Sequence, residues 1–301
     1  MKYILETINL TKKYNDKVVL KNVNLKVPEG SIFGLVGKNG AGKTTLMRIV
    51  GGLSNCSEGE YLIFDSKPTL KLRENIGMLI EQPGVFLNMT ALENLSYFSK
   101  LYNCSLEKND ELLKLVGLEK ARNKKVQQFS LGMKQRLGIA ISLLKNPKIL
   151  ILDEPINGLD PEGVYEIRKL LENLNQNYHT TIIIASHIIS ELYKLATDYA
   201  IIDEGQLKGQ FSKEELEELC SNNSYIIIDS NEVKKAEALL KKYYPNHTYK
   251  IHSNNVINIY NHIELAKLNQ LFVNNNINVH GLGINQEDIE KFFVSYLSGG
   301  K

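Results

Sequence analysis

A phosphate-binding pattern lies near the start of the chain. Residues 37–44 read Gly-Lys-Asn-Gly-Ala-Gly-Lys-Thr and fit G-x-x-x-x-G-K-[ST], after an apolar run at 32–36 and before a helical pattern that begins near Lys43. Glycines let the backbone fold around a phosphate with successive N–H groups pointing at it, and the N-terminus of the following helix adds partial positive charge. An incidental glycine-rich turn is the alternative, but the flanking strand and helix disfavour it. The pattern therefore predicts a P-loop, a site for a nucleoside triphosphate.

The side chains of this segment have distinct expected roles. Lys43 is long enough to reach the β- and γ-phosphates, the Thr44 hydroxyl is a ligand for Mg²⁺, and Thr45 adds a phosphate contact. The residues expected to contact the triphosphate are Gly37, Lys38, Asn39, Gly40, Ala41, Gly42, Lys43, Thr44 and Thr45.

Two carboxylates follow a short apolar run further along the chain. Residues 149–152 are Ile-Leu-Ile-Leu, which predicts a buried strand, and Asp153 and Glu154 come directly after it. Ligands of parallel α/β sheets bind beyond the carboxyl ends of the strands. There Asp153 would hold Mg²⁺, directly or through water, and Glu154 would polarise an attacking water as a general base. A strand that merely runs into an acidic turn is the alternative, and the P-loop in the same chain weakens it.

The remaining pattern predicts the elements that position these residues. Residues 1–28 alternate apolar and polar positions, as half-buried antiparallel strands do. Residues 148–153 and 181–186 are nearly continuous apolar runs, each followed by a helical pattern, which is typical of a parallel sheet covered on both faces. Residues 90–145 are mostly helical in pattern. We therefore expect an α/β fold with a mixed sheet, an antiparallel β subdomain and a helical insertion.

A second, smaller domain is expected after a polar break. Residues 221–224 are Ser-Asn-Asn-Ser, which predicts a boundary between a first domain, 1–220, and a small C-terminal α+β domain, 221–301. Strands and helices are expected there at 225–229, 231–243, 247–252, 255–260, 262–275, 277–284 and 286–297. The first six are in the order β-α-β-β-α-β, which resembles a split-βαβ, ferredoxin-like unit. We find no functional site in this domain, and its histidines lie at no metal-like spacing.

Composition and charge exclude several classes of protein. The chain has 301 residues, 43% hydrophobic and 23% charged, which is the range of ordinary globular proteins and long enough for two domains. Its formal net charge of +2 gives no global reason to expect nucleic acid as a partner. No apolar run approaches the roughly 18 residues of a membrane span, and the first residues lack a signal-peptide pattern. The widely spaced cysteines suit a reducing compartment and form no metal-ligand pattern.

A third motif, together with the two above, makes the chain resemble a known family. Residues 129–136, Phe-Ser-Leu-Gly-Met-Lys-Gln-Arg, stand shortly before the Asp-Glu strand. With the two motifs above, they make residues 1–220 resemble the nucleotide-binding subunit of ATP-binding cassette (ABC) transporters, whose L-S-G-G-Q signature occupies this place. Ser130 and Gly132 keep the signature, while Leu131 and Met133 depart from it.

The resemblance implies that the signature segment, residues 130–133, binds the γ-phosphate held by the opposite subunit of a dimer. The Ser130 hydroxyl, the Gly132 N–H group and the dipole of the following helix all suit that anion. Taken alone, Ser-x-Gly before a helix is only an N-cap.

Further positions match the family in order. The turn at 157–160 matches the D-loop, which crosses the dimer interface, although Asp160 also fits a plain helix N-cap. His187, directly after the apolar run that ends at Ser186, matches the switch histidine that contacts the γ-phosphate and orients water. Tyr14 stands where the family stacks an aromatic ring on adenine, and Val19 is expected to add an apolar contact there. A structural His at a strand end and a Tyr that packs on the sheet are the alternatives.

The glutamine that ends a strand in this family has two candidates here. Counting along the run 76–80, its place falls on Glu81, with Gln82 next to it. Either residue could touch Mg²⁺ or the attacking water, and we favour Glu81; an exposed acid at a strand end is the structural alternative. An acid at this place, and the sequence of residues 84–95, resemble the bacitracin-resistance and lantibiotic-immunity branch. In the family this loop links the nucleotide site to the membrane subunit.

Taken together, the resemblance implies an ATPase with ATP and Mg²⁺ as cofactors. Two copies of the chain, or one copy and a homologous subunit, would sandwich two ATP molecules. Separate transmembrane permease subunits would be driven through residues 81–95, which places the chain peripherally on the cytoplasmic face of a bacterial membrane. Export is favoured, for resistance or immunity to antimicrobial peptides, with the cargo chosen by the permease.

Two other functions compete with this interpretation. A soluble ABC ATPase of translation or DNA repair is disfavoured by the single cassette and the lack of sustained heptads. An unrelated P-loop kinase or GTPase would not need Ser130 or His187.

Overall fold

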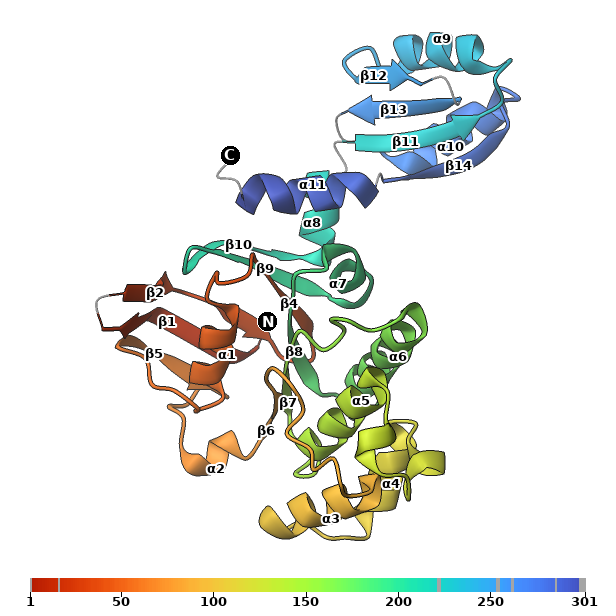
Figure 1. Cartoon of the computed structure of the whole chain (residues 1–301). Coiled ribbons are helices and arrows are strands. Elements are labelled where there is room, and N and C mark those ends of the chain that lie inside the picture. Colours follow the sequence, from red (N-terminus) through yellow and green to blue (C-terminus); the bar gives the residue numbers. More distant parts are fainter. Residues whose placement is uncertain are drawn as a thin grey trace. The chain divides into compact units, whose positions relative to one another are not determined.

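The computed structural model describes residues 2–15, 17–220, 223–252, 255–260, 263–284 and 286–297. By internal contacts the chain divides into two compact units, Met1–Gln210 and Phe211–Lys301 (Figure 1). Helix α8 (Lys213–Cys220) groups with the second unit, and the domain boundary expected after residue 220 stays a prediction. No helix among the described residues is both long and apolar enough to cross a bilayer.

A mainly parallel sheet forms the centre of the first unit. Its strand order is β10-β9-β4-β8-β7-β6, and the pairs from β9 to β6 run parallel. The strands are β4 (Ile32–Val36), β6 (Ile76–Leu79), β7 (Ile149–Asp153), β8 (Thr181–Ser186), β9 (Asp198–Asp203) and β10 (Gln206–Ser212). Every residue of β4, β7 and β8 is buried, which explains why their sequences are continuous apolar runs rather than alternating ones.

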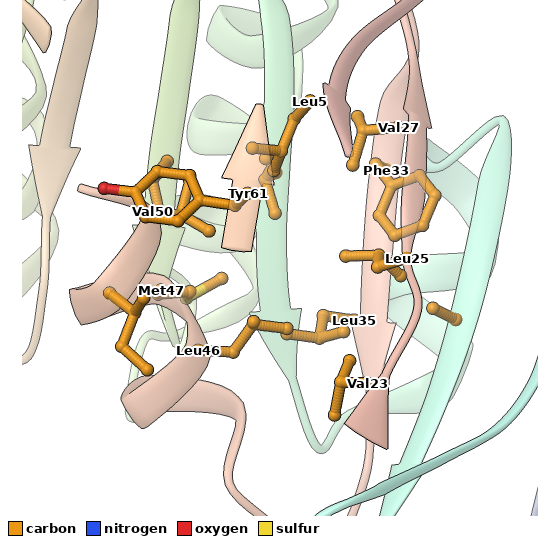
Figure 2. Close-up of a cluster of buried hydrophobic side chains, with 14 of the residues drawn as sticks. Leu5, Val23, Leu25, Val27, Phe33, Leu35, Leu46, Met47, Val50 and Tyr61 are labelled. Carbon is orange, nitrogen blue, oxygen red and sulfur yellow. The ribbon is translucent and has the colours of Figure 1, made fainter. Parts of the chain in front are cut away.

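An antiparallel sheet packs against this centre, as the alternation in residues 1–28 predicted. Its order is β2-β1-β3, with β5 paired to β1. The strands are β1 (Tyr3–Tyr14), β2 (Lys17–Val23), β3 (Lys26–Pro28) and β5 (Glu58–Ile63). Figure 2 shows how Leu46 and Met47 of helix α1 (Lys43–Val50) share one apolar core with Leu35 of β4 and with side chains of the antiparallel sheet. This core anchors the helix that follows the P-loop.

The expected helical insertion, residues 90–145, contains α3 (Ala91–Leu101), α4 (Lys108–Leu115), the 3-10 turns η1 (Glu119–Ala121) and η2 (Val126–Gln128), and α5 (Leu131–Ser142). The other helices of the first unit are α2 (Leu70–Arg73), α6 (Pro161–Tyr178), which packs against β8, and α7 (Ile189–Leu195), which packs against β4. A Cβ on Gly34 of β4 would lie 2.9 Å from Leu192 of α7, and one on Gly138 of α5 would lie 2.9 Å from Pro83. Helix α5 therefore packs closely on the loop that follows β6.

The second unit contains a separate antiparallel sheet with the order β12-β13-β11-β14. Its elements are α8, β11 (Asn223–Ile228), α9 (Val233–Tyr243), β12 (Thr248–Ile251), β13 (Val256–Tyr260), α10 (Leu265–Asn274), β14 (Val279–Ile284) and α11 (Gln286–Leu297). Its own core includes Ile226, Leu240 and Phe272, all fully buried. The order β-α-β-β-α-β with β11 between β13 and β14 is that of a split-βαβ unit, as the sequence predicted. Residue 262, where the helix predicted at 262–275 begins, lies outside the described residues.

Candidate functional site

The predicted site residues converge where parallel strands end. β4, β6, β7 and β8 run in the same direction, so the segments that follow them meet at one edge of the sheet. A cavity of about 530 Å³ lies at this edge. The described residues that line it are Val19, Asn39, Gly40, Gly42, Lys43, Thr44, Thr45, Glu81, Gln82, Leu131, Gln135, Asp153, Glu154 and Asn157.

The P-loop owes its shape to two of its glycines. A Cβ on Gly37 would lie 2.2 Å from the Ile202 carbonyl oxygen, so no other residue fits where this loop passes β9. Gly42 has a φ of +107°, a conformation that L side chains rarely adopt, and it begins helix α1. The loop therefore turns sharply and places the N-terminus of α1 at the cavity. That position favours an anion.

Lys43 is drawn inward at the start of this helix. Its side chain is buried, and its Nζ donates hydrogen bonds to the carbonyl oxygens of Gly37, at 2.6 Å, and Lys38, at 3.1 Å. Burial lowers the pKa of the Lys43 ammonium, while the nearby charges of Glu154 and Asp153 raise it. A buried cation bonded to neutral carbonyl oxygens is ready to pair with phosphate oxygens.

Thr44 and Asp153 are already in contact. The Thr44 hydroxyl donates to the Asp153 Oδ2 at 2.6 Å, and only 5% of Asp153 is exposed. Burial raises the pKa of the Asp153 carboxyl, and the Thr44 hydrogen bond opposes that rise. A hydroxyl beside a carboxylate is a donor set that suits Mg²⁺, which takes oxygen ligands and completes its shell with water and phosphates. No cluster of three or more His, Cys, Asp or Glu in the described part of the chain forms a metal site on its own.

Glu154 and His187 form the second contact of the site. His187 Nδ1 lies 2.9 Å from Glu154 Oε2, across the ends of β7 and β8. Glu154 has a φ of +50°, an uncommon conformation for a non-glycine residue, and its N–H group donates to the Ala185 carbonyl at 2.9 Å. The turn is thus tied to β8. One carboxylate oxygen faces the histidine, and the other is free of that contact and can accept a proton from water.

Both candidates for the loop after β6 line the cavity. Glu81 has a φ of +62°, and its Oε1 accepts a hydrogen bond from Arg48 Nη2 at 2.5 Å. No hydrogen bond joins the Gln82 side chain to another described residue. Cavity lining alone does not separate the two residues, and the choice between them stays a prediction.

The signature segment begins α5. The Ser130 hydroxyl accepts from the Met133 N–H at 3.2 Å and so caps the helix, as its N-cap interpretation requires. Gly132 is buried, and a Cβ there would lie 3.7 Å from Leu159 in the following turn. Of these four residues, Leu131 lines the cavity of its own chain. The action of residues 130–133 on a second subunit stays a prediction.

The other expected contacts divide into two groups. Val19 lines the cavity, whereas four other residues expected to contact the nucleotide are not among its lining residues: Tyr14, Gly37, Lys38 and Ala41. Tyr14 is exposed and has Lys12 Nζ 4.6 Å from its ring centroid, so its ring is on the surface. Asp160 accepts from the Gly163 N–H at 3.1 Å and caps α6, which satisfies the structural interpretation of that residue. None of these contacts tests a role in binding.

Three residues at the site had no role assigned from the sequence. Gln135 and Asn157, which lie within the quoted motifs 129–136 and 157–160, line the cavity, and Arg48 reaches Glu81 from α1. Gln135 is 5% exposed and its Oε1 has no hydrogen-bond partner among the described residues. Its position four residues after Leu131, on the same helical face, was a usable signal; Arg48 had none, because its partner is distant in the sequence.

Comparisons with known proteins agree with this geometry. A sequence profile of the family described as ABC transporter matches residues 20–157. The chain is 39% identical over 306 residues to the bacitracin transport ATP-binding protein BcrA of Bacillus licheniformis, covering 100% of this chain and 99% of that protein. It is 41% identical over 222 residues to the lantibiotic transport ATP-binding protein SrtF of Streptococcus pyogenes, covering 73% of this chain and 96% of that protein.

A solved structure has the same fold. The dimeric post-hydrolysis state of the ATP-binding cassette MJ0796, bound to ADP and Pi, matches with a TM-score of 0.61 at 28% identity. It covers 69% of this chain and 98% of that one. The alignment with BcrA spans both units of this chain, whereas the matches to SrtF and MJ0796 leave part of it uncovered.

Proposed function

Since this chain belongs to the ABC transporter family as one of its ATP-binding subunits, we propose that it hydrolyses ATP at the edge of its parallel sheet and thereby powers a separate membrane permease. The contact that carries the proposal is His187 Nδ1 to Glu154 Oε2, at 2.9 Å, at the ends of the neighbouring strands β8 and β7, and Thr44 contacts Asp153 beside it. A carboxylate in contact with a histidine next to the P-loop supports the proposal, because a general base needs a group that orients it.

Each side chain has a definite part in the reaction. Water attacks the γ-phosphorus, the bond to the β–γ bridging oxygen breaks, and ADP and phosphate are released. Glu154 polarises the water and accepts its proton, and His187 holds the Glu154 carboxylate in place. Lys43 and the N-terminus of α1 stabilise the charge on the phosphates. Mg²⁺, held by Thr44 and Asp153, would neutralise further phosphate charge when it is bound.

We also propose that two subunits enclose two ATP molecules. The P-loop of one subunit and residues 130–133 of the other would clamp each γ-phosphate. The exposure of Ser130 and Leu131 at the start of α5 supports this, because a partner can reach them. Asp160, capping the neighbouring helix, would lie at the same interface.

The relatives support a proposal for the partner and the class of cargo. Proteins named for bacitracin transport and lantibiotic transport favour an exporter of antimicrobial peptides over a soluble ABC ATPase of translation or DNA repair. The loop 81–95 would transmit the state of the nucleotide to the permease, and that partner would hold the chain at the cytoplasmic face of a bacterial membrane. The second unit, Phe211–Lys301, would be an accessory domain.

Two measurements test the proposal at separate levels. The purified chain should release phosphate from ATP only with Mg²⁺ present, and absence of nucleotide binding would overturn the enzymatic part. Affinity purification from detergent-extracted bacterial membranes should recover an integral membrane protein. Recovery of ribosomes or DNA alone would overturn the transporter part and leave the ATPase intact.

A further inference from the structure

The carboxylates of the cavity are each held by a specific side chain. Among the described lining residues these carboxylates are Asp153, Glu154 and Glu81. Thr44 holds Asp153 at 2.6 Å and His187 holds Glu154 at 2.9 Å, and both holders are residues that the family resemblance had already singled out. Arg48 holds Glu81 at 2.5 Å, and no motif in the sequence accounts for it.

Arg48 and Thr44 act from the same face of one helix. They are four residues apart on α1, which places their side chains one turn apart and side by side. The first turn of α1 therefore holds Asp153, and the next turn holds Glu81. The opposite face of α1 is fixed in the core through Leu46 and Val50 (Figure 2). Helix α1 therefore holds the Asp153 and Glu81 carboxylates at positions one helical turn apart.

Glu81 is also unusual in its backbone. Its φ of +62° is rare for a residue with a side chain, and it turns the chain sharply after β6. The negative charges of Asp153 and Glu154 repel the Glu81 carboxylate in this cavity unless a cation accompanies it. Arg48 supplies that cation within the protein. A divalent ion at Thr44 and Asp153 would supply another one turn away.

We propose that Arg48 is a positioning residue for Glu81. Arg48 competes with the bound divalent cation for the Glu81 carboxylate, and it holds that carboxylate against α1 until nucleotide and cation bind. The proposal rests on the proposed function, because it assigns the cation to the nucleotide pocket. Glu81 then joins the loop at 81–95 to the P-loop helix through Arg48 when the pocket is empty. When nucleotide and cation are bound, the Glu81 carboxylate contacts the cation instead.

Removal of Arg48 should therefore release Glu81 to the cation. In Arg48→Met, binding of Mn²⁺ to the protein loaded with a non-hydrolysable ATP analogue should tighten by about fivefold, the upper range for an exposed ion pair. In the Glu81→Gln background the same substitution should change Mn²⁺ affinity by less than about twofold, because salt screens the remaining charge effect. Arg48→Lys should restore the affinity of the unaltered protein. The measurement is electron paramagnetic resonance of free Mn²⁺, with no turnover.

The chain offers a closely matched control. Arg122 and Asp110 form an ion pair at 2.9 Å with side chains 40% and 60% exposed, against 42% and 64% for Arg48 and Glu81. Neither Arg122 nor Asp110 lines the cavity. Arg122→Met should leave Mn²⁺ affinity within about twofold of the unaltered protein. Thermal unfolding of all variants checks that they fold.

The outcomes separate this inference from the function on which it rests. If the unaltered protein binds no Mn²⁺–nucleotide, the proposed function fails. If it binds but Arg48→Met leaves Mn²⁺ affinity unchanged or weaker, Arg48 does not compete for Glu81. If Arg48→Met tightens Mn²⁺ binding equally with Glu81 and with Gln at position 81, or if Arg122→Met tightens it as much, the cause is a general charge effect. Either result would also overturn the inference.

Discussion

The two units each contain a histidine paired with a carboxylate. In the first unit His187 Nδ1 lies 2.9 Å from Glu154 Oε2, and in the second His280 Nε2 lies 2.7 Å from Asp229 Oδ1. The distances are alike and both histidines are partly exposed, at 40% and 56% of the side chain. The two pairs nevertheless have very different surroundings.

Strand direction is the source of that difference. β7 and β8 are parallel, so Glu154 and His187 meet at an edge that also receives the P-loop after β4. β11 and β14 are antiparallel, so the end of one meets the start of the other, and among the described side chains Asp229 bonds to His280 and Asn278. A proton-transfer pair becomes a catalytic candidate when the topology gathers other strand ends around it. The same pair on an antiparallel sheet is a surface contact.

Substitution of the carboxylate in each pair gives the most direct test of this difference. Glu154→Gln should lower phosphate release by about a hundredfold or more, because the amide cannot accept the proton of water. The variant should still bind ATP and form an ATP-dependent dimer, measured by size-exclusion chromatography. Asp229→Asn is the matched change in the other pair and should alter phosphate release by less than about twofold. Full ATPase activity in Glu154→Gln would remove Glu154 from its assigned role.

The next largest effect should distinguish packing from chemistry. Phe272 is fully buried in the core of the second unit, and Phe272→Ala should cost about 3–5 kcal/mol of its stability through lost contacts and a cavity. Amide exchange measured by mass spectrometry should show lost protection in β11, β13 and α10. ATP affinity should stay within about twofold, since none of the described residues that line the cavity belongs to this unit. A parallel loss of ATP binding would mean that the two units are not independent in function.

The two histidines should differ by a smaller but still clear factor. His187→Ala removes the group that holds Glu154, and misplacement of that carboxylate should slow phosphate release by about tenfold to a hundredfold. His280→Ala should leave the rate within about twofold. Equal rates for the two variants in a steady-state assay would remove the distinction between the pairs.

The sequence was sufficient where a local pattern determines the structure. The glycines of residues 37–44 and the apolar runs before Asp153 and His187 predicted the P-loop, β7 and β8, because such strands and turns depend on neighbouring residues. Strands β5, β9 and β10 were not predicted. β10 is only half-buried, so its sequence carries no apolar run, and its place in the sheet depends on residues far along the chain.

The site itself was predictable only as separate segments. The Thr44–Asp153 contact joins the first turn of α1, which follows β4, to the end of β7, and β8 lies between those two strands in the sheet. Its geometry therefore depends on a strand order that no local pattern gives. Arg48 to Glu81 spans 33 residues and joins a helix to a loop, with no pattern in either segment that indicates the other. The choice between Glu81 and Gln82 is of the same kind, because it depends on where a neighbouring helix places a charge.

The last and smallest expected effect concerns the two aspartates, whose pKa values should move in opposite directions. Hydrogen bonds from His280 and Asn278 lower the pKa of Asp229, whereas burial raises the pKa of Asp153. A lowered pKa means that the Asp229 carboxylate contributes stability above the ordinary Asp pKa of about 3.9, and that this contribution disappears as the pH falls through the lower folded value. Carbon-13 NMR titration should place the Asp229 midpoint below the ordinary value, and His280→Gln should raise it. An Asp229 midpoint at or above the ordinary value would mean that the His280–Asp229 contact does not form in solution. The difference between the two pairs would then be that one contact forms and the other does not, and strand direction would not explain it.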